Sequence, residues 1–347
     1  MPVNRRQFIG RSVLGAAALA TMRPFSAFAT FATPETCAAS VGLTTGVNRA
    51  DMAFRALSPF ASYIKKAVAG KRIILKPNNV SIDIPLCATH ADTLEGILEF
   101  FKSIGRTENI IIAESAANGP TFDGFSNYGY FSLAKKYNVK FMDLDREGSE
   151  VLYLFDERDF RPHPARFSKV LLDNTSFIVS AARMKTHDRV IATLSLKNIV
   201  VGAPVKDDGF RFDSKSRKGA ISDKSIVHGG GFKGINYNLY VTAPKLHPHL
   251  AVIDGFEGME GNGPNSGTPV DHRVCVASTD WLAADRVAVE LMGIDYTQVA
   301  WLNYCMQTGQ GVGDLDKIGI IGEKITDHII KYKLSDNIGQ QLILNKS

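Results

Sequence analysis

Short apolar runs that alternate with helical patterns constrain the fold of this chain most strongly. Residues 72–75 (RIIL) and 109–113 (NIIIA) are buried-strand patterns, and residues 91–104 between them carry apolar side chains at helical spacing. Further strands are expected at 139–144, 177–180, 251–255 and 274–277, and further helices at 128–138 and 281–292. Continuous apolar strands linked by helices are typical of sheets buried on both faces. We therefore expect an α/β fold, with a mostly parallel sheet covered by helices on both faces.

The first 29 residues have the pattern of a cleavable export signal. Arg5 and Arg6 precede a soft apolar run of about a dozen residues, well short of the roughly 20 that cross a bilayer. A small-x-small cleavage site follows at Ala27-Phe28-Ala29. Paired arginines favour the twin-arginine route. This predicts the twin-arginine translocase as a partner, export of the folded protein to the periplasm or cell exterior, and no stable membrane span after cleavage.

The signal also accounts for most of the net positive charge, because it supplies four of the five excess positive charges. The full chain has 40 Lys and Arg residues against 35 Asp and Glu. Arg5, Arg6, Arg11 and Arg23 lie within 1–29, where no acidic residue occurs. The mature chain is therefore nearly neutral, and its charge gives no reason to expect nucleic acid as a partner.

After the signal we expect a mobile lead over 30–45 and a single α/β domain over 46–347. Within that domain, residues 203–235 are polar, glycine-rich and without periodicity. Loops of this length in compact domains are functional or disordered. We interpret 203–235 as a lid or insertion near a site, with a mobile surface loop as the alternative.

The four cysteines (Cys37, Cys87, Cys275 and Cys305) are widely separated. No C-x-x-C pair occurs, so the chain has no in-line iron–sulfur or zinc-ribbon motif. Export would permit a disulfide, whereas free thiols are the simpler interpretation.

Three polar clusters with lysines follow expected strands, where open α/β sheets place their ligands. They are Lys76-Pro77-Asn78, Lys185-Thr186-His187 and Lys197-Asn198. A lysine close to an apolar segment is unusual because an unpaired buried ammonium is unfavourable. Each lysine taken singly is also compatible with a surface position. Together, Lys76, Asn78, Lys197 and Asn198 are candidates to bind an anion.

A fourth cluster, residues 254–264, has the composition of a flexible turn after an apolar strand. It carries Asp254, Glu257 and Glu260. Such carboxylates bind a hard cation or transfer protons, or are simply solvated. Glu114, at the end of its own strand, is a candidate to join them. The sequence thus leaves the cofactor open and makes a divalent metal the candidate.

Histidines and glycines supply weaker motifs. The segment 228–234 (HGGGFKG) offers backbone N–H groups to an anion, together with His228 and Lys233, but it lacks the ending of a P-loop. His247-Pro248-His249 is a conceivable metal pair without the spacing of known zinc motifs. Neither G-x-G-x-x-G after the first strand nor a G-x-S-x-G elbow occurs.

The order and spacing of several segments resemble the family known as domain of unknown function 362. The resemblance covers roughly 70–323 and is carried by ILKPN (74–78), IIIAES (110–115), MKTH (184–187), TLSLKN (193–198), VIDGFEGMEGNGPNSGTP (252–269), STDWLAADRVAVELMGID (278–295) and IGIIGE (318–323). It implies an architecture more readily than an activity. Some members carry ferredoxin-like cysteine clusters, which this chain lacks.

These observations favour an exported cofactor- or metal-dependent enzyme that acts on an anionic small molecule. The alternatives are a non-catalytic periplasmic binding protein for a ligand or metal and an electron-transfer accessory protein. The expected catalytic residues are Lys185, His187, Asp254 and Glu260. The expected anion-binding residues are Lys76, Asn78, Lys197, Asn198, His228 and Lys233. The expected metal ligands are Glu114, Asp254, Glu257 and Glu260.

Overall fold

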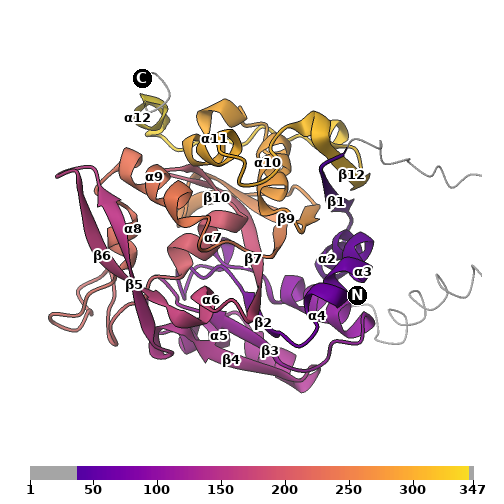
Figure 1. The fold of residues 1–347 in the computed structure, drawn as a ribbon, viewed down its shortest axis with the longest axis horizontal. Coiled ribbons are helices and arrows are strands. Elements are labelled where there is room, and N and C mark those ends of the chain that lie inside the picture. The colour runs from indigo at the N-terminus through magenta and orange to yellow at the C-terminus, as the bar shows by residue number, and fades with distance from the viewer. Residues whose placement is uncertain (1–36, 344–347) are drawn as a thin grey trace, which may run out of the picture. The chain divides into compact units, whose positions relative to one another are not determined.

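The computed structural model describes residues 37–343, so the predicted signal over 1–29 lies outside the described residues. Its centre is a ten-stranded sheet with the order β12-β1-β11-β9-β7-β2-β3-β4, to which β10 and β8 add beside β9 and β7 (Figure 1). The strands are β1 (Ala39–Thr45), β2 (Arg72–Lys76), β3 (Ile110–Glu114), β4 (Val139–Asp143), β7 (Ser176–His187), β8 (Ile191–Thr193), β9 (Leu250–Asn262), β10 (Ser266–Val270), β11 (Val274–Ser278) and β12 (Ile318–Gly322).

Most neighbouring strands on the main path of the sheet run parallel. β9, β7, β2, β3 and β4 form a parallel series, and β1 is parallel to β12. β11 runs antiparallel to both β1 and β9. The predicted α/β fold with a mostly parallel sheet is confirmed, with β11 as the antiparallel member that joins the two parallel parts.

Helices cover both faces because successive strand side chains point to opposite sides. Ile74, Ile178 and Ile253 pack in one core with α7, α9, α10 and α11. Their sequence neighbours Ile73 and Val252 pack in a second core with α2, α3 and α4. The helices are α2 (Arg49–Leu57), α3 (Ala61–Ala67), α4 (Ala91–Ser103), α5 (Thr121–Asn127), α6 (Lys169–Leu172), α7 (Ser195–Gly202), α8 (Lys224–Val227), α9 (Phe232–Thr242), α10 (Trp281–Leu291), α11 (Ala300–Gln307) and α12 (Ile338–Gln341).

Local sequence signals account for several of these boundaries. Helix α10 begins after Asp280, whose carboxylate accepts hydrogen bonds from the backbone N–H groups of Leu282 and Ala283 at 3.0 Å, as expected for an N-cap. Helix α4 and strands β2, β3 and β4 lie within a residue or two of the predicted ranges.

Three segments differ from the sequence-based expectation. Residues 39–45, expected in the mobile lead, form β1, because they pair with β11 and β12 and bury Val41 and Leu43 in the core. The range 128–138 holds a 3-10 helix at Tyr130–Lys135 rather than an α-helix. The expected flexible turn over 254–264 is instead the continuation of β9, which reaches Asn262 and pairs with β10.

The polar segment 203–235 is ordered by contacts with a two-stranded hairpin, β5 (Ser149–Asp156) and β6 (Arg161–Ser168), which lies at the left in Figure 1. Arg166 of β6 pairs with Asp223 at 2.9 Å, and Pro204 forms a bridge with Phe167. Helix α8 and the start of α9 complete the segment.

No helix in the part of the chain from residue 37 to 343 has both the length and the apolarity to cross a membrane.

Candidate functional site

A cavity of about 270 Å³ lies at the carboxyl ends of β2, β3 and β7. Lys76, Glu114 and His187 reach it from these strands, and Lys197 and Asn198 reach it from α7. Lys224 and His228 line it from the segment 203–235. The carboxyl edge of a parallel sheet is where α/β proteins bind ligands, so these residues form the candidate site.

The wall of the cavity is a closed network around Lys76. Its ammonium lies 2.6 Å from Oε1 of Glu114 and also donates to the carbonyl of Pro77 at 3.0 Å and to Oδ1 of Asn198 at 3.2 Å. Glu114 in turn accepts from the backbone N–H groups of Asn79 and Ser115. All three ammonium hydrogens therefore have acceptors, and Lys76 anchors the wall rather than offering a free charge.

Asn198 ties this network to two strands. Its Oδ1 also accepts from Nδ2 of Asn78 at 3.1 Å, and its own Nδ2 donates to the carbonyl of Lys76 and to Oγ of Ser180. Burial lowers the pKa of Lys76, while the Glu114 carboxylate acts in the opposite direction. Of the predicted anion-binding residues, Lys76 and Asn198 thus line the cavity with their polar groups already engaged.

Lys197 is different, because its ammonium has no partner. The side chain is only 6% exposed and lines the cavity. It forms no hydrogen bond or ion pair within residues 37–343. Burial, followed by the charge of Lys185, lowers the pKa of Lys197 to about 7. A buried amine poised between its two protonation states is typical of a ligand-binding or catalytic position.

Thr193, at the end of β8, supplies a second unpaired group. It is 1% exposed and lines the cavity, and its Oγ1 has no hydrogen-bond partner among the described residues. Buried hydroxyls are normally hydrogen-bonded. Thr193 and Lys197 thus each bring a polar group without a partner among the described residues to the lining of the same cavity.

His187 and His228 line the same cavity in opposite tautomers. The backbone N–H of Arg189 donates to Nδ1 of His187 at 3.0 Å, which leaves the proton of the neutral ring on Nε2. Nδ1 of His228 lies 2.7 Å from the carbonyl of Lys224, an acceptor only, so this ring carries its proton on Nδ1 and a lone pair on Nε2. The two rings present a donor and an acceptor.

Both imidazoles are neutral near pH 7. Burial, followed by the charge of Lys197, lowers the pKa of His228 to about 4 and that of His187 well below its usual range. Lys197 is the charged group that lowers the pKa of each ring most, and all three side chains line the same cavity. An anion bound beside Lys197 would raise all three pKa values.

Two further buried lysines stand around the cavity. Lys224 donates to the carbonyls of Pro204 at 2.6 Å and Gly202 at 3.1 Å, and burial lowers its pKa to about 7. Lys185 lies behind the lining, where it donates to the carbonyl of Cys87 at 2.8 Å. Burial lowers the pKa of Lys185 to about 8. The cavity is therefore surrounded by more cations than its lining carboxylates, Glu114 and Asp188, can balance.

The predicted carboxylates do not converge on this cavity. Asp254 follows Val252 on the α2 and α4 face of the sheet, where its Oδ2 accepts from Thr93 at 2.8 Å and lies 3.4 Å from Arg49 and 3.6 Å from Arg183. Glu257 pairs with Arg183 at 3.3 Å, and Glu260 accepts from the backbone N–H of Lys333 at 2.7 Å.

This separation corrects the expected grouping of Glu114 with Asp254, Glu257 and Glu260 as metal ligands. Because β9 continues as a strand, its carboxylates are distributed along a sheet instead of around a turn. Within the described residues, no three His, Cys, Asp or Glu side chains come close enough together to hold a metal ion. Lys233 is exposed on α9 and does not line the cavity. The described cysteines are free thiols.

Sequence reasoning missed Thr193 and Lys224. Thr193 is an ordinary strand residue by composition, and only the β7–β8 pairing turns it toward the cavity. Lys224 stands among several lysines in a polar segment, and nothing in the sequence distinguishes it from them. The capping of α7 by Asp285 was also not predicted: its carboxylate accepts from the N–H groups of Ser195 at 2.8 Å and Leu196 at 3.0 Å.

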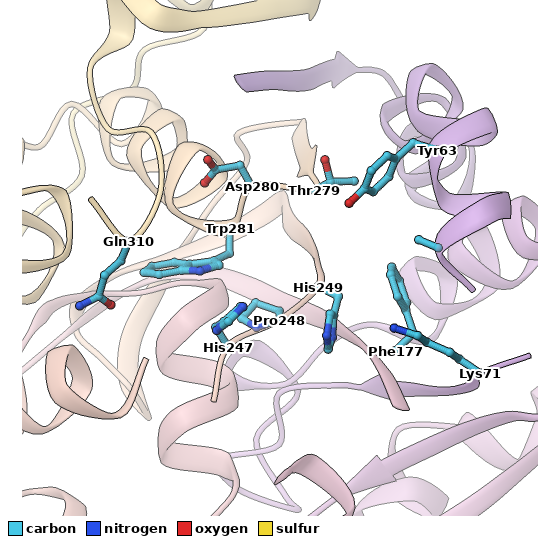
Figure 2. Close-up of a pocket in the computed structure, with 11 residues that line it drawn as sticks. Tyr63, Lys71, Phe177, His247, Pro248, His249, Thr279, Asp280, Trp281 and Gln310 are labelled. Atoms are coloured by element: carbon cyan, nitrogen blue, oxygen red, sulfur yellow. The ribbon is translucent and has the colours of Figure 1, made fainter. Parts of the chain in front are cut away.

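A second, more open cleft of about 380 Å³ lies at the opposite edge of the sheet, near the starts of β7 and β9 (Figure 2). Its histidines hold backbone groups: Nδ1 of His247 donates to the carbonyl of Ala243 at 2.7 Å, and Nδ1 of His249 accepts from the N–H of Ile178 at 3.0 Å. His249 also stacks on Phe177. Since these histidines serve the local backbone, the cavity around Lys197 is the stronger candidate.

The fold and this cavity define an α/β protein with an unpaired amine and two neutral imidazoles at the carboxyl edge of its sheet. Residues 73–290 match the family described as "Domain of unknown function (DUF362)". The match spans more than half of the chain, so the chain belongs to this family.

Three similar proteins illustrate the relationship. The chain is 24% identical over 228 residues to the Thylakoid-associated protein sll1697 of Synechocystis sp. (strain ATCC 27184 / PCC 6803 / Kazusa), which covers 65% of this chain and 64% of that protein. This chain therefore spans slightly less than two thirds of the length of that relative. The lactate racemase apoprotein of Thermoanaerobacterium thermosaccharolyticum gives a TM-score of 0.43 with 11% identity, covering 75% of this chain and 58% of the other. A protein of Thermotoga maritima gives 0.38 with 10% identity, covering 77% and 60%.

Proposed function

We propose that this chain is an enzyme that binds a small organic anion in the cavity around Lys197 and transfers protons to and from it. The observation that carries this proposal is the unpaired Lys197 ammonium, which shares its cavity with two neutral imidazoles in opposite tautomers. A buried cation without a counter-ion is unfavourable, and an anionic ligand would supply that counter-ion.

The size and charge of the cavity limit the size and the chemical class of the ligand. A volume of about 270 Å³ suits a molecule of a few carbon atoms rather than a nucleotide. Lys197 and Lys224 supply positive charge, and Thr193 supplies a hydroxyl without a partner. A short carboxylic acid that also carries an oxygen or nitrogen substituent satisfies all of these groups.

The histidine pair supports acid–base chemistry. His187 can donate a proton from Nε2 while His228 accepts one at Nε2, because the backbone fixes the Nδ1 of each ring in the opposite state. Their depressed pKa values keep both rings neutral before the ligand enters, and a bound anion raises these values toward the working range.

Binding is tested by titrating purified protein with oxalate, glyoxylate, lactate and phosphate and measuring thermal stability and heats of binding. We expect one or more of the carboxylates to stabilise wild-type protein, and Lys197→Met to lose at least tenfold in affinity. Lys65→Met, which removes an exposed helical lysine of α3, is the matched control and should bind like the wild type. If none of these anions binds, the proposed site is wrong.

Catalysis is tested separately with ²H₂O. An enzyme that removes and returns a carbon-bound proton incorporates deuterium at C2 of a bound 2-hydroxy or 2-amino acid, or at C3 of a bound 2-oxo acid, which NMR detects. His228→Gln and His187→Gln should abolish the exchange while retaining most of the binding. Binding without exchange or other turnover would instead favour the alternative, a non-catalytic ligand-binding protein.

We further propose that residues 1–29 direct export by the twin-arginine translocase to the periplasm or cell exterior. Support comes from the Arg5-Arg6 pair, the short apolar run and the small-residue cleavage site. Residues 1–35 fused to a reporter protein should deliver it to the periplasm of a bacterium with the translocase. Arg5→Lys with Arg6→Lys should retain the reporter in the cytoplasm; export of that double variant would contradict the proposal.

A further inference from the structure

The Nζ of Lys197 differs from the other buried amines of the site in having no acceptor. Lys76 uses all three hydrogens, Lys224 uses two on backbone carbonyls, and Lys185 uses one on Cys87. Lys197 uses none within the described residues, although its side chain is only 6% exposed. If the amine served only to attract an anion, hydrogen bonds to backbone carbonyls would favour its ammonium form and fix its position. Lys197 is instead left with its nitrogen free.

The surroundings of Lys197 also keep its nitrogen available as a nucleophile. Burial and the charges of Lys185 and Lys76 disfavour the ammonium form, and Asp188 is the acidic group that opposes them. The neutral amine, and not the ammonium, attacks carbonyl carbon. This desolvated setting among other cations is the one in which lysines form imines with carbonyl compounds.

We propose that Lys197 forms an imine with a carbonyl acid, so that the ligand class of this cavity is a small 2-oxo acid. This proposal rests on the proposed anion site and specifies its ligand. The carboxylate of the ligand would take Lys224 and the Thr193 hydroxyl as partners, which directs the neighbouring carbonyl carbon to Nζ of Lys197.

The chemical step balances with the groups of the cavity. The lone pair of Nζ forms the N–C bond, and the carbonyl π electrons move to oxygen, which Nε2–H of His187 stabilises by a hydrogen bond. Nε2 of His228 accepts the two amine protons in turn and returns each to that oxygen. The oxygen leaves as water and the C=N bond remains. No group is oxidised or reduced, and no other reactant is needed.

The imine is tested by reductive trapping in the purified full chain. Glyoxylate is the probe and cyanoborohydride the reductant, whose hydride converts the imine into a stable secondary amine. Intact-mass measurement should show one carboxymethyl group per protein at low glyoxylate, and peptide mapping should place it on Lys197. Oxalate, which binds as an anion but has no aldehyde or ketone carbonyl, should protect Lys197.

Two variants make the result specific. Lys197→Arg keeps the positive charge but cannot form this imine, so it should lose the single rapid modification. Lys65→Arg removes an exposed lysine of α3 and should be trapped at Lys197 at the wild-type rate. Modification spread over surface lysines, or a Lys197 signal that oxalate does not reduce, would overturn the imine proposal.

The two proposals fail in different ways. If oxalate binds in a Lys197-dependent manner while glyoxylate leaves Lys197 unmodified, the imine is wrong and the anion site stands. If none of oxalate, glyoxylate, lactate and phosphate binds and glyoxylate leaves Lys197 unmodified, the anion site itself is wrong.

Discussion

Nζ of Lys76 lies 2.6 Å from Oε1 of Glu114, and both side chains are almost completely buried. The pair joins the ends of β2 and β3, two adjacent parallel strands. Its energetics are those of a buried ion pair, in which the loss of one partner leaves an uncompensated charge. The wall of the cavity therefore depends on both residues, although Lys76 has no hydrogen left for a ligand.

Glu114→Gln should destabilise the protein by roughly 3–5 kcal/mol, because Lys76 then remains buried without a counter-charge. Urea unfolding followed by circular dichroism measures this loss. The double variant Lys76→Met, Glu114→Gln should recover part of it, since both charges are removed together. Equal stability of Glu114→Gln and the wild type would show that the pair does not support the wall.

Gly202 is a position at which even the smallest side chain should disturb the wall of the site. A Cβ there would overlap Cε and Nζ of Lys76. Gly202→Ala should therefore displace the Lys76 ammonium and cost about 1–3 kcal/mol by overpacking, although alanine is the better helix former. Gly339→Ala in α12 is the matched control, because nothing lies near its added Cβ. Thermal unfolding should show a loss for Gly202→Ala and no loss for Gly339→Ala.

Lys197 should make the stability of the protein depend on pH above neutrality. Its pKa is about 7 in the folded protein against 10.5 ordinarily. Between these values the unfolded chain binds more protons, so the folded state gains stability as pH rises. Lys197→Met should therefore be more stable than the wild type by an amount on the order of a few kcal/mol at pH 7, falling toward zero near pH 10.

Unfolding curves from pH 6 to 10 measure this difference, with Lys65→Met as the control that should show no such trend. A stability gain for Lys197→Met that is the same at every pH would mean that Lys197 is protonated throughout, which contradicts its depressed pKa.

Much of the fold followed from sequence because its signals are local. Ile110–Ile112 is a continuous apolar run in a buried parallel strand, and Asp280 is an N-cap next to an amphipathic helix. The full length of strand β9 was harder to predict from the sequence. Its glycines and acidic residues after Asp254 suggest a turn, whereas the pairing with β10 keeps the segment extended. That pairing is a tertiary property, and local propensity does not contain it.

In the site, too, some features could be predicted from the sequence and others depend on the tertiary structure. Lys76 and His187 were found because strand ends in such sheets converge. Lys197 was also expected after a strand but lies in α7, and the structure places all three on one cavity. The sequence could not show which of these amines have hydrogen-bond acceptors and which have none. The three acceptors of Lys76 come from Pro77 just after β2, from β3 and from α7, whereas Lys197 has none among the described residues, and only their spatial arrangement separates an anchoring lysine from a free one.

Anion binding should take up protons above pH 7. Free Lys197 loses its proton near pH 7, and a bound anion favours the ammonium form, so binding at pH 8 draws a proton from the buffer. Calorimetry with oxalate in HEPES and in Tris, which differ in ionisation enthalpy, should give different apparent heats. The affinity should also fall up to tenfold per pH unit above 7, because the lysine must first be protonated. Lys197→Met should reduce both effects and leave only the contribution of Lys224, whose pKa is also about 7. A wild-type affinity that stays constant from pH 6 to 9 would show that the charge of Lys197 does not hold the anion.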